Sequence, residues 1–137
     1  MTSRLLVFDP GRTTGWARFE DGQLSAWGEL ILWRGIDKMI RHGDTVAYER
    51  IQALHPSFDS IGIQVIGVIC YLCEQQQIEP RGVHPGSLTG PQHWPGHEEL
   101  RKLLSSEHAY DAVLHGAVLL KSRGLRDLLD SVKTSQI

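Results

Sequence analysis

Residues 4–17 read RLLVFDPGRTTGWA, and this stretch decides which fold the chain adopts. Residues 5–8 form a short apolar run, which is typical of a central strand that is buried on both faces. Pro10 and Gly11 break the run, so Asp9 directly follows the strand at its carboxyl end. The sequence therefore predicts a buried first strand with an acidic side chain at its exit.

The residues that follow are typical of a hairpin. Residues 14–20 and 23–31 have the composition of two strands, and Asp21-Gly22 lies between them. A two-residue Asp-Gly connection strongly indicates a tight turn, because both turn positions tolerate positive φ. We therefore expect the chain to begin with a meander of strands.

Two further strands and several helices are expected in the rest of the chain. The strands are residues 45–48, which end at Glu49, and residues 81–84. We also expect a short helix at 35–42, a long helix that Ser57 or Asp59 caps and that ends near Gln77, a loop at 85–96, helices at 98–104 and 108–121, and a leucine-rich terminal helix or interface segment at 125–132. This order predicts one α/β domain over residues 1–137, with a mixed five-stranded sheet and helices on both faces.

The composition is that of an ordinary soluble α/β protein, with 137 residues of which 41% are hydrophobic and 22% charged. Residues 1–4 run straight into the first strand, so we expect no signal peptide. The most apolar run, residues 61–73, is shorter than the ~20 residues of a membrane span, which favours a buried helix. Cys70 and Cys73 lie in that run without a second pair to complete a zinc site, which favours core packing and a reducing, cytoplasmic location.

The formal net charge is −2, with seven histidines counted as neutral. Most nucleic-acid binders are basic, so the net charge disfavours such a partner. Clustered acids that hold divalent cations are balanced only when those cations are bound, which offers one account of the negative charge.

Three acidic residues lie beside buried elements. Asp9 and Glu49 each follow an apolar strand, and both carboxylates would emerge at one edge of the sheet if these strands are parallel neighbours. Asp111 lies on a later predicted helix, where the spacing places it on one stripe with His108 and His115. Each acid alone has a structural interpretation as a turn former or an exposed residue. Their joint placement favours a shared site.

A cluster of carboxylates requires a positive ion, because like charges without cationic partners repel each other. Hard oxygen ligands favour Mg²⁺ or Mn²⁺, and a histidine ligand shifts the preference toward Mn²⁺. Two such ions about 4 Å apart would orient a water and stabilise the attacking and leaving oxygens of a phosphodiester. The residues therefore predict a metal-dependent nuclease.

Three motifs resemble those of the RuvC family of Holliday-junction resolvases, which have an RNase H-like fold. The first is a strand that runs into Asp-Pro-Gly and then Thr-Gly-aromatic-Ala, here FDPGRTTGWA at residues 8–17. The second is a strand that ends in Glu, here VAYE at 46–49, and the third is a helix that reads HAYDAVL at 108–114. The ordered motifs span roughly residues 4–122, and a leading histidine in the third is a variant that some RuvC enzymes use.

The resemblance implies a homodimer that cuts two strands of a four-way DNA junction symmetrically. Asp9 and Glu49 would share two Mg²⁺ or Mn²⁺ ions per active site, and Asp111 and His108 would complete the site. His108 would ligate metal or help to activate the attacking water. His115 is a weaker candidate for the site.

The residues that would grip DNA depart from the family's pattern. The family often carries an aromatic wedge three residues after the Glu, where this chain has Gln52, and Phe58 or Leu54 are the available substitutes. The family's Pro-x-x-apolar-Lys after the fifth strand is PGSLT at residues 85–89, without the lysine. The candidate DNA contacts are Arg12, Arg50 and Phe58, followed by Arg81, Arg101, Lys102 and Trp94, for which surface or loop roles are equally good explanations.

The long predicted helix is apolar almost all round, so we expect it to be covered on two faces. One cover would be the sheet. The other would be the same helix of a second copy in a two-fold homodimer, or the C-terminal helix in a monomer.

Three other functions fit parts of this pattern. Another RNase H-like nuclease, such as the type that processes pre-ribosomal RNA, would cut structured RNA. A junction-binding protein that does not cleave would account for the missing lysine, although all four site positions hold competent ligands. A phosphate-binding ATPase also opens with a similar hairpin, but it needs two such domains and a longer chain.

Overall fold

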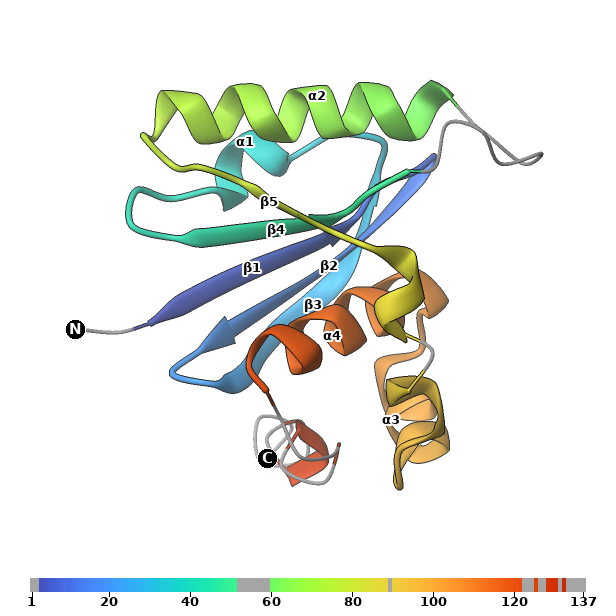
Figure 1. Ribbon diagram of the computed structural model, residues 1–137. Coiled ribbons are helices and arrows are strands. Elements are labelled where there is room, and N and C mark those ends of the chain that lie inside the picture. The colour runs from blue at the N-terminus through green and yellow to red at the C-terminus, as the bar shows by residue number, and fades with distance from the viewer. Residues whose placement is uncertain are drawn as a thin grey trace.

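A computed structural model describes residues 3–51, 60–88 and 90–121 and, near the C-terminus, residues 125, 128–130 and 132. The strands are β1 Arg4–Asp9, β2 Thr13–Glu20, β3 Gln23–Ile31, β4 Thr45–Glu49 and β5 Arg81–Val83. They form one sheet in the order β3-β2-β1-β4-β5 (Figure 1). β1 is antiparallel to β2 and parallel to β4, β2 is antiparallel to β3, and β4 is parallel to β5. The predicted mixed five-stranded sheet is confirmed.

The helices lie close to where the sequence predicts them, with ends that differ by one to a few residues. They are α1 Ile36–Met39, α2 Ser60–Gln75, α3 His97–Leu104 and α4 Glu107–Leu119. α1 is only one turn long, because Gly35 is left-handed at its start and Ile40 is already extended at its end. The predicted caps of the long helix, Ser57 and Asp59, lie outside the described residues.

The prediction of a loop over residues 85–96 was wrong in part. Two 3₁₀ turns lie there, η1 Pro85–Leu88 and η2 Pro91–His93. Each begins with a proline, whose fixed φ suits the first position of a helical turn. The prolines that indicated a loop therefore start short helical turns instead.

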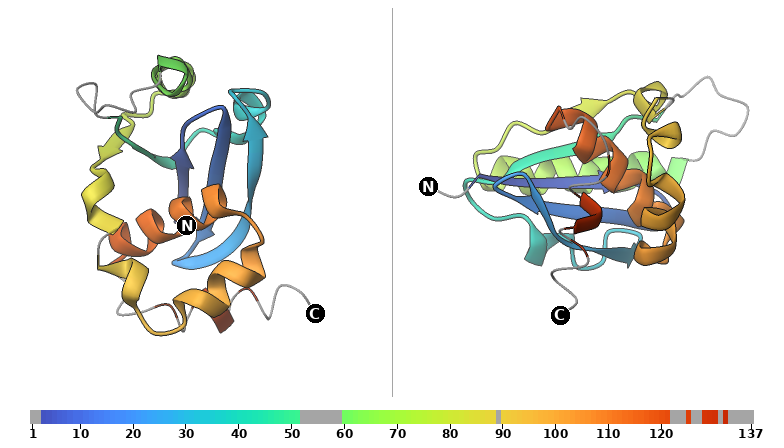
Figure 2. Two further views of the ribbon diagram at one scale, coloured as in Figure 1. Left: turned by 90° about the vertical axis from the view of Figure 1, so that its right-hand side faces the viewer. Right: turned by 90° about the horizontal axis from the view of Figure 1, so that it is seen from below.

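Alternate side chains of β1 enter two separate hydrophobic cores. Leu6 and Phe8 pack with Ile69 of α2 on one face, and Leu5 and Val7 join the core beside α3 and α4 on the other. Figure 2 shows α1 and α2 on one side of the sheet and α3 and α4 on the opposite side. The prediction of helices on both faces is confirmed.

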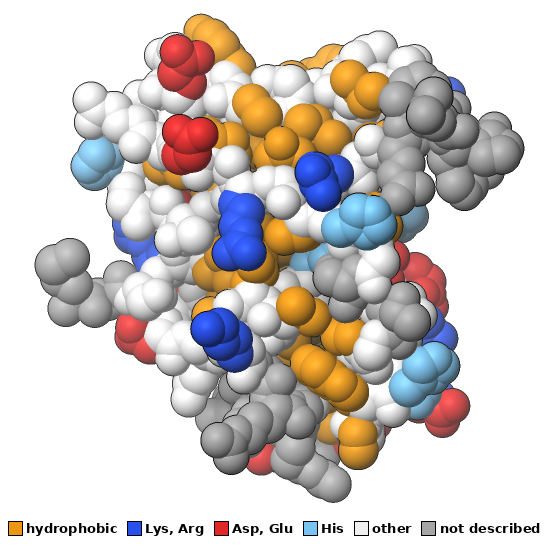
Figure 3. Space-filling model, in the orientation of Figure 1, with side chains coloured by type: hydrophobic (Ala, Val, Ile, Leu, Met, Phe, Trp, Pro, Cys, Tyr) orange, Lys and Arg blue, Asp and Glu red, His pale blue; other side chains and the backbone are white. Residues whose placement is uncertain are grey.

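Only one stripe of α2 is buried, and it consists of Gly62, Val65, Ile69 and Cys73. On the outer side, Ile63 and Tyr71 remain 43% and 61% exposed. Figure 3 shows apolar side chains gathered over α2 on the face that it draws. No helix among the described residues is long and apolar enough to span a membrane.

The described part of the C-terminal segment packs on the side of the sheet opposite to α2. Its buried members all join the core beside α3 and α4, and they are Leu125, Leu128, Leu129 and Val132. The alternative in which this segment covers the outer face of α2 is therefore wrong for the residues that the structure describes.

The two cysteines are free thiols, and Cys73 is buried while Cys70 is partly exposed. Cys73 belongs to the core between α2 and the sheet, where burial raises the pKa of its thiol to about 11. The prediction of core packing is confirmed for Cys73.

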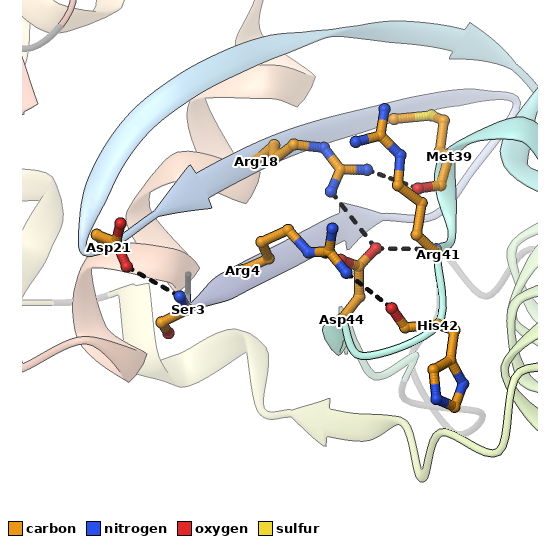
Figure 4. A network of polar contacts seen from close by, with 8 residues as sticks. All are labelled: Ser3, Arg4, Arg18, Asp21, Met39, Arg41, His42 and Asp44. Atoms are coloured by element: carbon orange, nitrogen blue, oxygen red, sulfur yellow. Dashed lines mark hydrogen bonds and ion pairs between the residues drawn. The ribbon is translucent and has the colours of Figure 1, made fainter. Parts of the chain in front are cut away.

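A charged cluster lies buried at the start of β4 (Figure 4). The Asp44 side chain is fully buried, with Oδ1 2.9 Å from Arg4 Nε and Oδ2 3.4 Å from Arg18 Nη1. The backbone N–H of Arg41 donates to Oδ2 at 2.9 Å, and Arg18 also donates to the carbonyl of Met39. We call Arg4, Arg18 and Asp44 the arginine cluster. It ties β1, β2 and the segment before β4 together.

Candidate active site

Asp9 and Glu49 lie side by side at one edge of the sheet. β1 and β4 are parallel and pair Phe8 with Tyr48, so the next residue of each strand is its terminal acid. The side chains of Asp9 and Glu49 are 13% and 19% exposed, and a hydrogen bond joins them. The parallel pairing that would bring both carboxylates to one edge is confirmed.

The turn that follows Asp9 is held by Thr14, whose side chain is buried. The N–H of Gly11 donates to Thr14 Oγ1 at 3.3 Å, and the Thr14 hydroxyl donates back to the carbonyl of Gly11 at 3.2 Å. A buried polar group that is satisfied in this way fixes the backbone next to it. The Asp-Pro-Gly turn is therefore a rigid exit from β1.

Helix α4 begins directly beside this edge. The Ser106 hydroxyl accepts the N–H of Ala109 at 3.0 Å as the helix cap, and it donates to the carboxylate of Glu29 on β3. A Cβ atom on Gly15 of β2 would collide with the backbone carbonyl of His108. Only a glycine therefore allows α4 to come this close to the strand that pairs with Asp9.

This close approach places two side chains of α4 at the carboxylates. His108 is about half exposed, and its Nδ1 lies 3.5 Å from Asp9 Oδ2. Asp111, one turn further along the helix, lies close enough for its charge to raise the pKa of Asp9. We call Asp9, Glu49 and Asp111 the acidic cluster.

Two of the three carboxylates, Asp9 and Asp111, have raised pKa values. Burial, the hydrogen bond with Glu49 and the charges of Glu49 and Asp111 together raise the pKa of Asp9 to about 9. Burial and the charge of Glu49 raise the pKa of Asp111 to about 6, against the opposing effect of the nearby histidines. Burial also acts to raise the pKa of Glu49, but its contacts with His115 and Asp9 outweigh burial and lower it. Without a cation, Asp9 therefore carries a proton at neutral pH and shares it with ionised Glu49.

His115 directly faces the Glu49 carboxylate, which its spacing along the helix did not indicate. Its side chain is fully buried, and its Nε2 lies 3.7 Å from Glu49 Oε1. The sequence offered the helical stripe with Asp111 as a signal. It could not indicate which strand residue the ring would meet.

The donors of this site suit a hard divalent cation. The acidic cluster supplies oxygen atoms and His108 a nitrogen, which are the ligands that Mg²⁺ and Mn²⁺ take. In the part of the chain that the structure describes, no three His, Cys, Asp or Glu side chains are arranged to hold an ion. They contact each other in pairs instead, Asp9 with Glu49 and His108, and Glu49 with His115. A cation fits the chemistry of this set if it takes the place of the proton that the carboxylates share.

Two of the predicted DNA contacts, Arg12 and Arg50, lie close in the chain to Asp9 and Glu49. Arg12 is exposed in the turn after β1, and its carbonyl accepts the N–H of Leu32 at 3.0 Å. Arg50 follows Glu49, and its aliphatic stem lies across Gly82 of β5, where a Cβ would collide with it. Phe58 lies outside the described residues, as do Gln52 and Leu54.

Two further candidates are engaged within the fold. Arg101 pairs with Glu107 at 3.2 Å, and its guanidinium lies 4.9 Å from the centre of the Tyr110 ring. Trp94 is partly buried against the core beside α3 and α4. This packing favours the interpretation that Trp94 holds its loop in place.

The chain matches no protein-family model and no curated protein by sequence. Among solved structures it is similar to the RuvC structure of Thermus thermophilus, with a TM-score of 0.59 and 12% identity. The match covers 87% of this chain and 97% of the RuvC chain. At this identity the likeness shows the fold alone, and the predicted RNase H-like fold is confirmed.

Proposed function

We propose that this protein is a divalent-metal-dependent endodeoxyribonuclease of the RuvC type, which resolves four-way DNA junctions by paired phosphodiester hydrolysis. The observation that carries the proposal is the convergence of Asp9, Glu49, Asp111 and His108 from β1, β4 and α4. Burial and the charge of Glu49 raise the pKa values of Asp9 and Asp111, so this arrangement of three carboxylates is unfavourable, and a bound cation makes it favourable.

Each residue of the site has a defined role in this proposal. Asp9 and Glu49 would be ligands of the metal ions, and Asp111 and His108 would complete the ligand set. Two Mg²⁺ or Mn²⁺ ions would supply an activated water and stabilise the developing charge on the leaving oxygen. Asp9 would release its shared proton to the solvent on cation binding. His108 lies at the open side, where it can ligate metal or accept a proton from the attacking water.

The outer face of α2 supports the homodimer that junction resolution requires. Ile63 and Tyr71 are exposed there, and the described C-terminal residues pack on the other side of the sheet. A two-fold interface through α2 would cover these apolar side chains. Because a four-way junction has approximate two-fold symmetry, such a dimer would present one active site to each of two strands.

We propose that Arg12 and Arg50 contact the DNA backbone and that Phe58 takes the place of the missing aromatic wedge. Arg12 supports this role because it is exposed in the turn directly after Asp9. Arginine suits phosphate contacts because its planar guanidinium donates several hydrogen bonds.

The test is cleavage by the purified protein of a labelled four-way junction, a sequence-matched duplex and a structured RNA, with and without Mg²⁺ or Mn²⁺. The proposal expects paired, symmetric cuts in the junction only when metal is present. Cleavage of the RNA in preference to the junction would favour an RNA-processing enzyme. Tight junction binding without cleavage at saturating metal would identify a non-cleaving binding protein. Either result would refute the proposed activity.

A further inference from the structure

His115 lies buried beneath the acidic cluster. The residue is 1% exposed, and its Nε2 faces Glu49 Oε1 at 3.7 Å. A polar ring in a protein core lowers stability unless its polar atoms find partners. An aliphatic side chain would serve packing alone at lower cost, so the position of His115 next to a site carboxylate points to a role in that site.

The two histidines of α4 contact different carboxylates of the acidic cluster. His108 and His115 lie on one stripe of the helix, about 10 Å apart along its axis. The Nδ1 of His108 lies 3.5 Å from Asp9 Oδ2, whereas the Nε2 of His115 lies 3.7 Å from Glu49 Oε1. The side chain of His108 is 49% exposed and that of His115 is 0% exposed. Substrate can therefore reach His108, whereas buried His115 acts through the side chains around it, among them the carboxylate of Glu49.

Glu49 is the site residue that most needs such support. It is the last residue of β4, and its long side chain has more freedom to rotate than that of Asp9. A carboxylate has two oxygen atoms, so a partner that holds one leaves the other available. Ligands of metal sites are commonly fixed in this way by groups that do not touch the metal.

We infer that His115 is a positioning residue whose Nε2, in electrostatic contact with Glu49 Oε1 at 3.7 Å, steadies that oxygen and thereby presents the other oxygen to the divalent cation. The inference rests on the proposed function only in assigning a cation to the acidic cluster. Helix α4 then has two roles. It supplies Asp111 and His108 to the open side of the site, and through His115 it positions Glu49 from the buried side.

The test compares two variants of the full chain, His115→Gln and His115→Asn. The amide nitrogen of glutamine reaches about as far as Nε2 of histidine, whereas asparagine ends near the position of Nδ1. Both variants place a neutral amide in the same buried position, so they control for each other. The measurement is the affinity for Mn²⁺ alone, by calorimetry, after circular dichroism has shown that each variant is folded.

We expect His115→Gln to keep most of the Mn²⁺ affinity and His115→Asn to weaken it by about 10–100-fold. Equal Mn²⁺ affinity in both variants and the wild type would overturn the inference, because a purely structural role changes stability alone. If His115→Asn does not fold, His115→Met replaces it, since methionine has a similar length and no donor.

Two further results separate this inference from the alternatives. A weaker nitrogen coupling in the Mn²⁺ electron-spin-echo spectrum of His115→Gln than in that of the wild type would make His115 a direct ligand and overturn the positioning role. A wild-type protein that binds Mn²⁺ but cuts no junction would refute the proposed function. The positioning role would then be tested by the Mn²⁺ affinities of the His115 variants alone.

Discussion

Asp44 directly precedes β4 and Glu49 ends it, and both belong to buried groups of charge. Asp44 meets two arginines, with contacts of 2.9 and 3.4 Å, and also accepts a backbone N–H. Glu49 meets a second carboxylate and a buried histidine. The arginine cluster is therefore balanced by the protein itself, while the acidic cluster has an excess of negative charge.

This difference indicates that the arginine cluster serves the fold and that the acidic cluster serves function. A buried charge that is fully paired contributes to a specific fold, and removing its partner is strongly destabilising. A buried group of like charges opposes folding unless protons or a cation compensate the charge. Its presence at the edge where two parallel strands end is best explained by the ion and the substrate that it would hold.

The largest effect is expected from Asp9→Asn. If the acidic cluster binds the catalytic metals, this change removes several kcal/mol of transition-state stabilisation, which is about a thousandfold or more in rate. Junction binding should remain close to that of the wild type, and Glu49→Gln should behave in the same way. The measurement is single-turnover cleavage at saturating metal, beside a gel-shift assay. Wild-type rates in either variant would refute the assignment of the site.

The next largest effect is expected from Asp44→Asn, and it concerns stability. The change leaves the buried Arg18 guanidinium without its anionic partner, so the free energy of unfolding should fall by about 3–5 kcal/mol. Urea denaturation measures this change, and Asp37→Asn on exposed α1 is the matched control. Equal stabilities of the two variants would contradict the structural role of the arginine cluster.

A smaller effect is expected from Gly15→Ala, which tests how α4 reaches the acidic cluster. The added methyl collides with the carbonyl of His108, so we expect a loss of about 1–3 kcal/mol in stability and a lower cleavage rate. Gly90→Ala is the control, since that position is open and its φ of −74° suits alanine, so its stability and cleavage should stay close to those of the wild type. Thermal unfolding and cleavage assays report both, and unchanged cleavage in folded Gly15→Ala would refute the close approach.

The smallest effect is expected from His108→Asp. Replacing a nitrogen ligand by an oxygen ligand should keep activity and shift the metal preference from Mn²⁺ toward Mg²⁺ by several-fold. The ratio of initial rates in the two metals measures this shift. An unchanged ratio would count against His108 as a ligand and leave it a role in activating water.

Much of the fold follows from local signals in the sequence. The apolar run at residues 5–8 and the Asp21-Gly22 turn predict the first strands, because alternation and turn chemistry act over a few neighbouring residues. The proline-rich segment at 85–96 was misjudged because proline both breaks and begins helical turns. Whether those turns form depends on packing against distant parts of the chain, which the local sequence does not indicate.

The site was predictable in its residues and less so in its geometry. Asp9, Glu49 and Asp111 stand out because each lies beside a buried element. The contact of His115 with Glu49 joins residues far apart in the chain and depends on how α4 crosses the sheet. That crossing depends on Gly15, which a sequence pattern cannot distinguish from a glycine in a turn.

The most direct test of the central claim is calorimetric titration of Mn²⁺ into the wild type and Asp9→Asn between pH 7 and pH 8, in buffers of different ionisation enthalpy. In the metal-free protein the pKa of Asp9 is raised to about 9, so Asp9 is protonated throughout this range. A raised pKa contributes stability that is present at low pH and lost as the pH rises through about 9, and a cation that displaces the proton must bind more tightly as the pH rises. We predict that the wild type binds Mn²⁺ with release of a proton and with affinity that increases with pH, and that Asp9→Asn loses both. Binding without proton release, or equal binding by the two proteins, would contradict the account.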